Sequence, residues 1–341
     1  MIRIFKLTTI LLAFTLLLAA CWPGTQAPTP TPSASLEFAY LASPDVQAIP
    51  PTLYYYADGA STVLMRNIRN FAWSPDGKTI AAEIVYGASF SDRAISLFDL
   101  QTRQGTLFVQ GGSPSWSPDG TQIAYEVSPT NLPNSGGIFV TGLQQYNPTR
   151  KLVGLNRSVS DPTWSPDGKW IAYSDYAGSS YTFYIVNVET AINRVIADGL
   201  RDGVSGIAWS SDGTKIIFDA LGDNNTDIYL ADLTAGTVTD LTTDDPEHID
   251  ESASWSPDGT SILFVSFRVD DVAQIFKMKA DGSDVTQLSN VAGFEPVWSP
   301  NSSEILYAKK DGSIVLMNAD GSGLTPVPQV EPKAYYAKWR P

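Results

Sequence analysis

The sequence predicts an all-β protein, because one short phrase recurs along most of the chain at a nearly constant spacing. It reads "FAWSPDGKTIAAEI" at its first occurrence and "ASWSPDGTSILFVS" at a later one. Successive tryptophans of the phrase are 41 to 48 residues apart. Units of four strands that repeat every 40–45 residues, roughly, are typical of a β-propeller, which is the fold we predict. The repeat tryptophans are Trp73, Trp116, Trp164, Trp209, Trp255, Trp298 and Trp339.

Each unit contains four short strands in the predicted fold. The first ends at the tryptophan, and the second follows Ser-Pro-Asp-Gly with alternating apolar and polar residues, as in "TQIAYEV" (121–127). The third is an apolar segment such as "DIYLADL" (227–233) or "QIFKMKA" (274–280). A weaker fourth strand such as "TVTDLT" (237–242) ends the unit. No segment after residue 36 has a sustained helical period.

Strands from both ends of the chain are expected to close the ring. Six complete units run from Trp73 to just before Trp339, which leaves one first strand, "AKWRP", at the C-terminal end. The segments "LEFAYL" (36–41), "TLYYYAD" (52–58) and "STVLM" (61–65) match the second, third and fourth strands of a unit. We therefore predict one propeller of seven four-stranded blades, because this arrangement closes the sheet edges. Six blades is the alternative if residues 36–66 pack only as an arm.

The Ser-Pro-Asp-Gly segment is predicted to be a hairpin turn and not a catalytic motif. Proline fixes φ, aspartate bonds to nearby backbone, and glycine accepts a positive φ. The variation among copies supports this interpretation, because Ser211 replaces the proline once and Asn301-Ser302 replaces Asp-Gly once. Asparagine cannot act as a general acid or base. We expect the preceding tryptophan to be a wedge that is buried between neighbouring blades.

The N-terminal segment has the pattern of an export signal. Arg3 and Lys6 precede an apolar run from Leu7 to Leu18, which is too short for a membrane-spanning helix of about 20 residues. The run Leu-Ala-Ala-Cys that ends at Cys21 resembles the bacterial lipobox. We therefore expect a lipoprotein signal peptide at 1–20, a lipidated Cys21 with a Pro/Thr-rich tether at 21–35, and the propeller at 36–341. The alternative is an ordinary secretory signal followed by an incidental cysteine.

Charge and cysteine content exclude several classes of partner. Removal of residues 1–20 takes away two positive charges and leaves 20 basic against 36 acidic residues, a net charge of −16. Such a surface repels nucleic acid and anionic lipid head groups, so the membrane is expected to be contacted only through the lipid anchor. With its single cysteine lipidated, the mature chain has no disulfide and no cysteine–metal site.

The repeats resemble the TolB-like, WD-repeat-like propeller repeats of bacterial envelope proteins. Their pattern, "WSPDGxxIAF…IYVMDxDGS…LT", is matched closely from Trp255 through "SFRVDDVAQIFKMKADGSDVTQLS". The resemblance covers residues 36–341 and implies the propeller fold together with protein partners in the cell envelope. Because such rings also carry enzymes, it does not by itself specify an activity. TolB itself has an additional N-terminal α/β domain, and the sequence before residue 36 does not match one.

The enzymes known on related propellers require residues that this sequence lacks. There is no Gly-x-Ser-x-Gly nucleophile elbow, and "GVSG" at 203–206 has the wrong spacing. Related oligogalacturonate lyases bind a metal through several histidines, whereas this chain has one, His248. The acidic segment around it, "TTDDPEHIDESASW", does not match the calcium-loop spacing, so we interpret it as a solvated connection and predict no metal ligand and no cofactor.

One face of the ring is the predicted binding surface. The connections between fourth and first strands, and between second and third strands, meet around the channel mouth. Arginines and aromatic residues at a concave mouth are typical of protein or peptide recognition. The candidate binding residues are Arg66, Arg69, Tyr86, Arg93, Tyr176, Tyr181, Arg201, Asp202, Asp250, Glu251, Arg268 and Glu295, with Phe90, Asp270 and Asp271 beside them.

We therefore predict a non-catalytic, membrane-anchored extracytoplasmic propeller, periplasmic or at the cell surface, that serves as a scaffold for an envelope protein or peptide. One alternative is a metal-dependent enzyme or small-ligand sensor at the channel mouth, with His248 and its acidic neighbours as candidates. Another is a glycan-binding module in which Tyr176, Tyr181 and Tyr335 stack on sugar rings.

Overall fold

The computed structural model describes residues 36–341 apart from 44–49, 88–91, 130–134, 144–148, 156–158, 177, 179, 202, 223–224 and 244–246. The predicted signal, Cys21 and the tether lie outside the described residues, as do Phe90, Asp202, Asp244 and Asp245. All regular secondary structure in the described ranges is β-strand. No helix in them is long and apolar enough to cross a bilayer.

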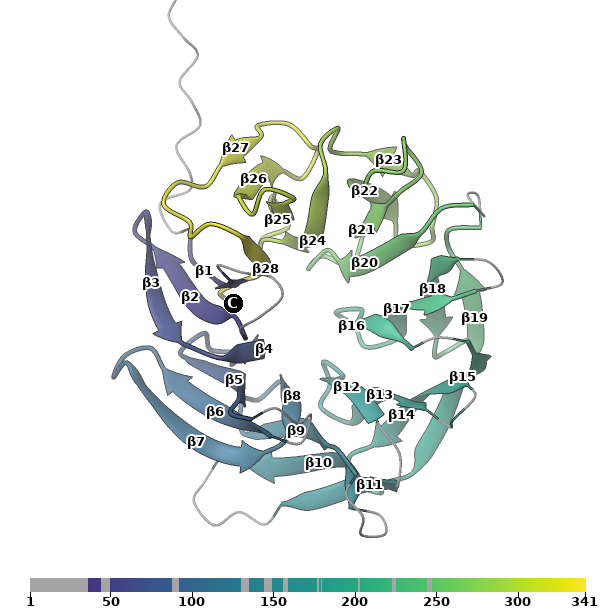
Figure 1. Cartoon of the computed structure of the whole chain (residues 1–341). Coiled ribbons are helices and arrows are strands. Elements are labelled where there is room, and N and C mark those ends of the chain that lie inside the picture. Colours follow the sequence, from purple (N-terminus) through teal and green to yellow (C-terminus); the bar gives the residue numbers. More distant parts are fainter. Residues whose placement is uncertain are drawn as a thin grey trace, which may run out of the picture. The chain divides into compact units, whose positions relative to one another are not determined.

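Seven four-stranded antiparallel sheets follow one another around a ring (Figure 1). We number these blades from 1, which contains the first strand of the chain, to 7. Within each blade the strands are paired in sequence order from the axis outward, except that the last strand of the chain is the inner strand of blade 1. The prediction of an all-β propeller with seven blades is confirmed, and the six-bladed alternative is wrong.

The inner strand of every blade ends at a repeat tryptophan, as predicted. From blade 1 to blade 7 these strands are β28 (Ala334–Trp339), β4 (Ile68–Trp73), β8 (Gly112–Trp116), β12 (Val159–Trp164), β16 (Ser205–Trp209), β20 (Asp250–Trp255) and β24 (Gly293–Trp298).

The second and third strands are the most buried, because other strands flank them on both sides. The second strands, in blade order, are β1 (Phe38–Ala42), β5 (Thr79–Val85), β9 (Gln122–Val127), β13 (Trp170–Tyr176), β17 (Lys215–Leu221), β21 (Ser261–Ser266) and β25 (Glu304–Lys309). The third strands are β2 (Thr52–Ala57), β6 (Arg93–Asp99), β10 (Gly136–Gly142), β14 (Tyr181–Asn187), β18 (Thr226–Asp232), β22 (Gln274–Lys279) and β26 (Ile314–Asn318).

The fourth strands form the outer rim and vary most in length, from eight residues in β15 to two in β23 and β27. In blade order they are β3 (Ala60–Met65), β7 (Gln104–Gln110), β11 (Arg150–Leu155), β15 (Asn193–Leu200), β19 (Thr237–Asp240), β23 (Thr286–Gln287) and β27 (Thr325–Pro326).

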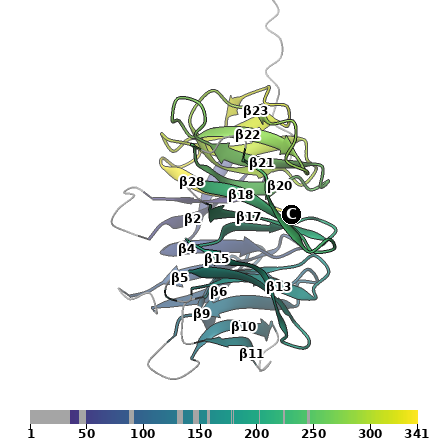
Figure 2. The same ribbon diagram turned by 90° about the vertical axis from the view of Figure 1, so that its right-hand side faces the viewer.

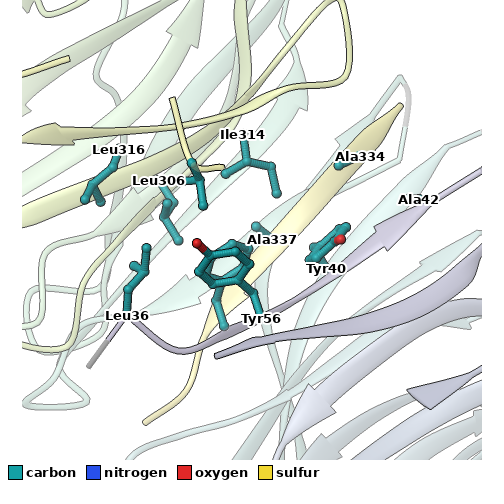
Figure 3. Packing of buried hydrophobic residues seen from close by; sticks show 11 residues of the cluster. Leu36, Tyr40, Ala42, Tyr56, Leu306, Ile314, Leu316, Ala334 and Ala337 are labelled. Carbon is teal, nitrogen blue, oxygen red and sulfur yellow. The ribbon is translucent and has the colours of Figure 1, made fainter. Parts of the chain in front are cut away.

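Blade 1 closes the ring by joining the two ends of the propeller. β28 pairs antiparallel with β1, from Phe38 opposite Trp339 to Ala42 opposite Ala334. Apolar residues of β28, β1 and β2 then pack against β25 and β26 of blade 7 (Figure 3). Tyr40 is fully buried in this cluster, and its hydroxyl donates to Ser61 Oγ at 2.7 Å. The three N-terminal strands therefore occupy the positions predicted for them.

The Ser-Pro-Asp-Gly segments form turns at one end of the strands. In blade 4, Ser165 Oγ donates to Asp167 Oδ1 at 2.7 Å and the Lys169 amide donates to the same oxygen at 3.0 Å. Gly168 has a φ of 72°. Burial raises the pKa of Asp167, but these hydrogen bonds outweigh it and hold the pKa below its usual value. Asp167 is thus an ionised turn residue.

The turn of blade 7 shows that the carboxylate charge is dispensable there. Asn301 Oδ1 accepts from Ser299 Oγ at 2.7 Å and from the Ser303 amide at 3.1 Å, as the aspartate oxygen does elsewhere. We call this side of the ring the turn face and the opposite side the mouth face. In the side view of Figure 2 the connections between strands lie along these two faces.

Each repeat tryptophan is a wedge between blades. Its ring is buried or half-buried, and in five blades its indole N–H donates to a backbone carbonyl of the preceding blade. The acceptor is always the residue just before the previous repeat tryptophan; Trp116 Nε1, for example, lies 3.1 Å from the oxygen of Ala72. Trp164 and Trp298 are exceptions, because their buried indole nitrogens have no partner among the described residues.

This difference predicts unequal costs for the same substitution at two matched positions. Trp116→Phe removes a made hydrogen bond, whereas Trp298→Phe removes a buried N–H that has no partner, and the two side chains are 8% and 9% exposed. We expect Trp116→Phe to lower the free energy of unfolding by about 1 kcal/mol more than Trp298→Phe does. Urea titrations followed by circular dichroism measure both. Equal losses, or a larger loss at Trp298, would contradict this account.

Candidate functional site

Every inner strand, the strand nearest the ring axis, contains a β-bulge. The bulge falls at or next to the residue three positions before the tryptophan, where the pairing with the second strand changes register. In six blades this residue has a positive φ, between 49° and 60°. A bulge leaves a residue out of the ladder and reorients its side chain. In blade order these residues are Tyr336, Asn70, Ser113, Asp161, Gly206, Ser252 and Glu295.

Five of these residues line a cavity of about 390 Å³ inside the ring. Because β12 and β24 lie on opposite sides of the ring and both contribute, the cavity lies in the central channel (Figure 1). Its volume is within the range of small-ligand sites, which is roughly 300–1,000 Å³. The lining residues are Leu41, Arg69, Asn70, Glu83, Arg93, Ser113, Glu126, Asp161, Glu295, Tyr335 and Tyr336.

Buried carboxylates on three second strands support this channel. Glu83, Glu126 and Asp219 each stand ten residues after a repeat tryptophan and are 1%, 6% and 2% exposed. Glu83 accepts from the Ser113 amide at 2.9 Å, and Asp219 accepts from the Ser252 amide at 2.7 Å. Since both donors belong to the bulge of the next blade, these carboxylates tie neighbouring blades together at the channel wall.

Arg93 is enclosed by two of these carboxylates. Its Nη1 lies 3.2 Å from Glu83 Oε1 and 2.7 Å from Glu126 Oε1, and its Nη2 donates to Ser128 Oγ at 2.9 Å. Burial lowers the pKa of Arg93, but the charges of Glu126 and Glu83 outweigh it and raise the pKa. A side chain at Gly112 would displace this guanidinium, because a Cβ there would lie 2.6 Å from Arg93 Nη1.

Asp161 and Glu295 differ from the other cavity carboxylates. Neither side chain has a hydrogen-bond or ion-pair partner within the described ranges. Burial and the charge of Glu83 raise the pKa of Asp161, even though water reaches its side chain from the cavity. Burial and the charge of Glu251 raise the pKa of Glu295.

One ammonium group of the chain already lies near these carboxylates. Lys338 Nζ donates to the Phe71 carbonyl at 3.0 Å and lies 4.7 Å from the centre of the Tyr336 ring. Its charge lowers the pKa of both Asp161 and Glu295, against the larger effect of burial. The channel wall therefore accommodates a cation on an aromatic face.

Comparison with known proteins gives the family. The model of the TolB beta propeller domain matches residues 145–329, which is more than half of the chain. The chain belongs to the TolB β-propeller family. An uncharacterised protein of Agrobacterium fabrum is 27% identical over 232 residues, which cover 65% of this chain and 74% of that protein.

Two solved structures illustrate how widely this TolB-type ring is shared. TolB from Acinetobacter baumannii has a TM-score of 0.55 and 20% identity, over 90% of this chain and 67% of that one. An oligogalacturonate lyase from Vibrio parahaemolyticus has a TM-score of 0.62 and 13% identity, over 86% of this chain and 85% of that one. At these identities the likeness concerns the fold alone.

Some of the predicted mouth residues of this TolB-type propeller are exposed, and others lie deeper in the ring. Arg66, Arg69, Tyr86 and Arg201 are exposed, with Tyr86 at 59%. Tyr176 and Tyr181 contact each other with ring centres 4.7 Å apart. Arg93, Glu251 and Glu295 lie deeper: Arg93 and Glu295 are in the cavity wall, and burial raises the pKa of Glu251.

Two further predicted residues form a pair on blade 6. Arg268 Nη2 lies 3.0 Å from Asp250 Oδ2, and its guanidinium lies over the rings of Phe264 and Phe276. His248 Nε2 lies 3.6 Å from Asp271 Oδ1. Within the described residues, no three His, Cys, Asp or Glu side chains are placed to hold a metal ion.

Sequence reasoning missed the cavity residues Asn70, Glu83, Ser113, Glu126, Asp161 and Tyr336, together with Asp219 and Lys338. Alignment of the repeats on their tryptophans does contain a signal for these positions. The position three residues before it holds mostly Asn, Ser, Asp or Gly, which are the residues that short polar turns and left-handed backbone favour. Carboxylates recur ten residues after the tryptophan in three units.

Asp219 predicts a pH dependence of stability. Burial raises its pKa to about 7, against the hydrogen bonds from Ser252 and Ala253. Between about pH 4 and pH 7, Asp219 is therefore protonated in the folded state and ionised in the unfolded state. The free energy of unfolding falls as the pH rises through this window. Because Asp219→Asn cannot titrate, we expect it to lose less stability than the wild type over this window, by roughly 2–4 kcal/mol.

Urea titrations at about pH 4.5 and about pH 8 measure this difference. The matched control is Asp198→Asn, on the exposed outer strand β15, which should follow the wild type. The amide group of the Asp219→Asn variant also changes the hydrogen bonds at this position, at both pH values. The comparison therefore uses only the difference in the free energy of unfolding between the two pH values. Parallel pH profiles for Asp219→Asn and the wild type would contradict a buried titrating carboxylate.

Proposed function

We propose that this chain is a lipid-anchored extracytoplasmic protein whose propeller binds an envelope protein or peptide through its mouth face and catalyses no reaction. The observation that carries this proposal is the contrast between the two faces. On the turn face, the aspartates of the turns accept hydrogen bonds from their own segments. On the mouth face, side chains such as Arg66 and Tyr86 are exposed. The channel cavity contains two carboxylates, Asp161 and Glu295, that have no hydrogen-bond or ion-pair partner in the described part of the chain.

The first and last strands of the propeller place its two ends on the same face. The Arg340 amide donates to the Glu37 carbonyl at 3.0 Å, and Arg340 Nε donates to Gly77 O of the blade 2 turn at 2.8 Å. Both ends of the propeller are therefore on the turn face. The predicted tether is therefore joined to the propeller at a residue of the turn face.

The residue types on the mouth face also favour it as the binding surface. Exposed arginine and tyrosine side chains are enriched where proteins recognise each other, because they combine apolar area with directed hydrogen bonds. Membership of the TolB β-propeller family agrees with a role in the envelope. The single histidine cannot supply the several histidine ligands of the related lyases, and the sequence lacks the Gly-x-Ser-x-Gly elbow of the related hydrolases. Both observations support a binding role.

The anchor is tested by labelling cells with a clickable fatty acid. We expect the wild type to carry the label and Cys21→Ser to lose it and to run as a larger precursor, because both lipid transfer and signal removal require the cysteine thiol. Ser33→Ala, in the tether, is the control and should keep the label. Label that persists in Cys21→Ser would exclude a lipid anchor at this residue.

The binding face is tested by photo-crosslinking in intact cells. A photoreactive residue at Tyr86, on the mouth face, should crosslink a partner, and the same residue at the exposed Gln101, on the turn face, should not. Reversing three mouth charges with Arg66→Glu, Arg69→Glu and Arg201→Glu should remove the crosslink, because the partner must match these charges.

The control for this variant reverses three exposed charges of the turn face, Lys78, Arg103 and Lys169, to glutamate. It carries the same net charge and should keep the crosslink. Circular dichroism verifies that both variants are folded. A crosslink that survives the mouth-face reversal, or that forms equally from Gln101, would exclude the mouth face as the binding surface.

A further inference from the structure

We propose that the channel cavity receives a lysine or arginine side chain of the bound peptide, held between Asp161 and Glu295. This inference rests on the proposed function and adds the chemistry by which the partner is recognised. It starts from the shape of the site: a cavity of about 390 Å³ in the channel, with Asp161 on β12 and Glu295 on β24 on opposite sides of the ring.

The cavity's charges favour a cation over an anion. The guanidinium of Arg93 is compensated by Glu83 and Glu126, so it offers no free positive charge to a ligand. Asp161 and Glu295 have no hydrogen-bond or ion-pair partner among the described residues, and the charges of Arg69 and Lys338 act on them only from a distance. Arg69 is the remaining cationic lining residue, and it is exposed at the rim. A bound ammonium or guanidinium would form charge-assisted hydrogen bonds with the two carboxylates.

The rest of the wall suits the same ligand. Tyr335 and Tyr336 line the cavity, and the Tyr336 hydroxyl donates to Asn70 Oδ1 at 3.3 Å. Aromatic faces attract cations and also pack against the apolar part of a lysine or arginine side chain. The chain shows this contact itself, since Lys338 Nζ lies 4.7 Å from the Tyr336 ring centre.

The backbone at both carboxylates indicates that they are positioned for the cavity. Asp161 has a φ of 53° and Glu295 has a φ of 51°, a conformation in which glycine is cheaper than any other residue. Blade 5 has Gly206 at the same position, where the carboxylate of Asp219 leaves no room for a Cβ. In blades 4 and 7 the chain instead has an acidic side chain with no hydrogen-bond or ion-pair partner among the described residues.

The test selects a random-peptide phage library on the full chain, purified in detergent. We expect the enriched peptides to share a lysine or arginine at one position. Synthetic copies in which this residue is glutamine should bind roughly tenfold more weakly or worse. The double variant Asp161→Asn/Glu295→Gln should lose the selected peptides to a similar extent.

The matched control is Asp58→Asn/Asp198→Asn, which removes the same two charges from exposed positions outside the cavity and should bind like the wild type. Melting curves show whether each variant is folded. Peptides enriched without a basic residue, or retained by Asp161→Asn/Glu295→Gln, overturn this inference and leave the proposed function intact. If no peptide is enriched and no crosslink forms at Tyr86, both fail together.

Discussion

The ring depends on a hydrogen bond between neighbouring blades, from an indole N–H to the carbonyl just before the previous repeat tryptophan. In five blades this bond, together with the packing of the indole ring, fixes the inner strand relative to the one before it; in blades 4 and 7 only the packing of the ring does so. A slip of the strand would lose the bond and expose the ring, so the register is strongly specified. The same bond closes the circle, because Trp73 donates to the Lys338 carbonyl and Trp339 to the Val297 carbonyl. Closure therefore requires strands from both ends of the chain in blade 1.

The tryptophan also sets the positions that face the channel. Counted from it, one residue lies three positions before, in the bulge, and another lies ten positions after, on the second strand. The scaffold fixes where these side chains lie. The residue type at each position can therefore differ between blades without a change of fold. Ten residues after the tryptophan, Glu83, Glu126 and Asp219 are acidic, whereas the equivalent Val265 and Ala308 are apolar. The channel is therefore asymmetric within a repetitive ring.

The fold could be predicted from the sequence to the level of individual strands, because local signals agree with one another. The tryptophan spacing gave the unit, the Ser-Pro-Asp-Gly turn gave the first hairpin, and "TLYYYAD" gave a strand of the closing blade, observed as Thr52–Ala57. Each signal is local in the chain and repeated, so an error in one copy is corrected by the others.

The site could be predicted only in part. The sequence indicates which connections share the mouth face, and exposed residues such as Arg66 and Tyr86 lie there. It did not show that Arg93 is enclosed by Glu83 and Glu126, because this requires the distance between two blades. It also did not place Asp161 in the channel, since in a regular strand the orientation of a side chain follows from alternation and a bulge changes that orientation.

Asp161 and Glu295, which have no hydrogen-bond or ion-pair partner among the described residues, have a physical cost that the fold does not require. Nearby protein removes part of the hydration of these carboxylates, and this loss, together with the charges of Glu83 and Glu251, raises the pKa values of Asp161 and Glu295. Lys338 offsets only part of it, and the left-handed backbone adds strain at both positions. Glycine at the bulge would avoid both costs, as Gly206 does in blade 5. Serine, found in blades 3 and 6, would avoid the cost of a poorly hydrated carboxylate. Strain and poor solvation that stability does not explain are typical of binding sites, because there a ligand supplies the missing partner.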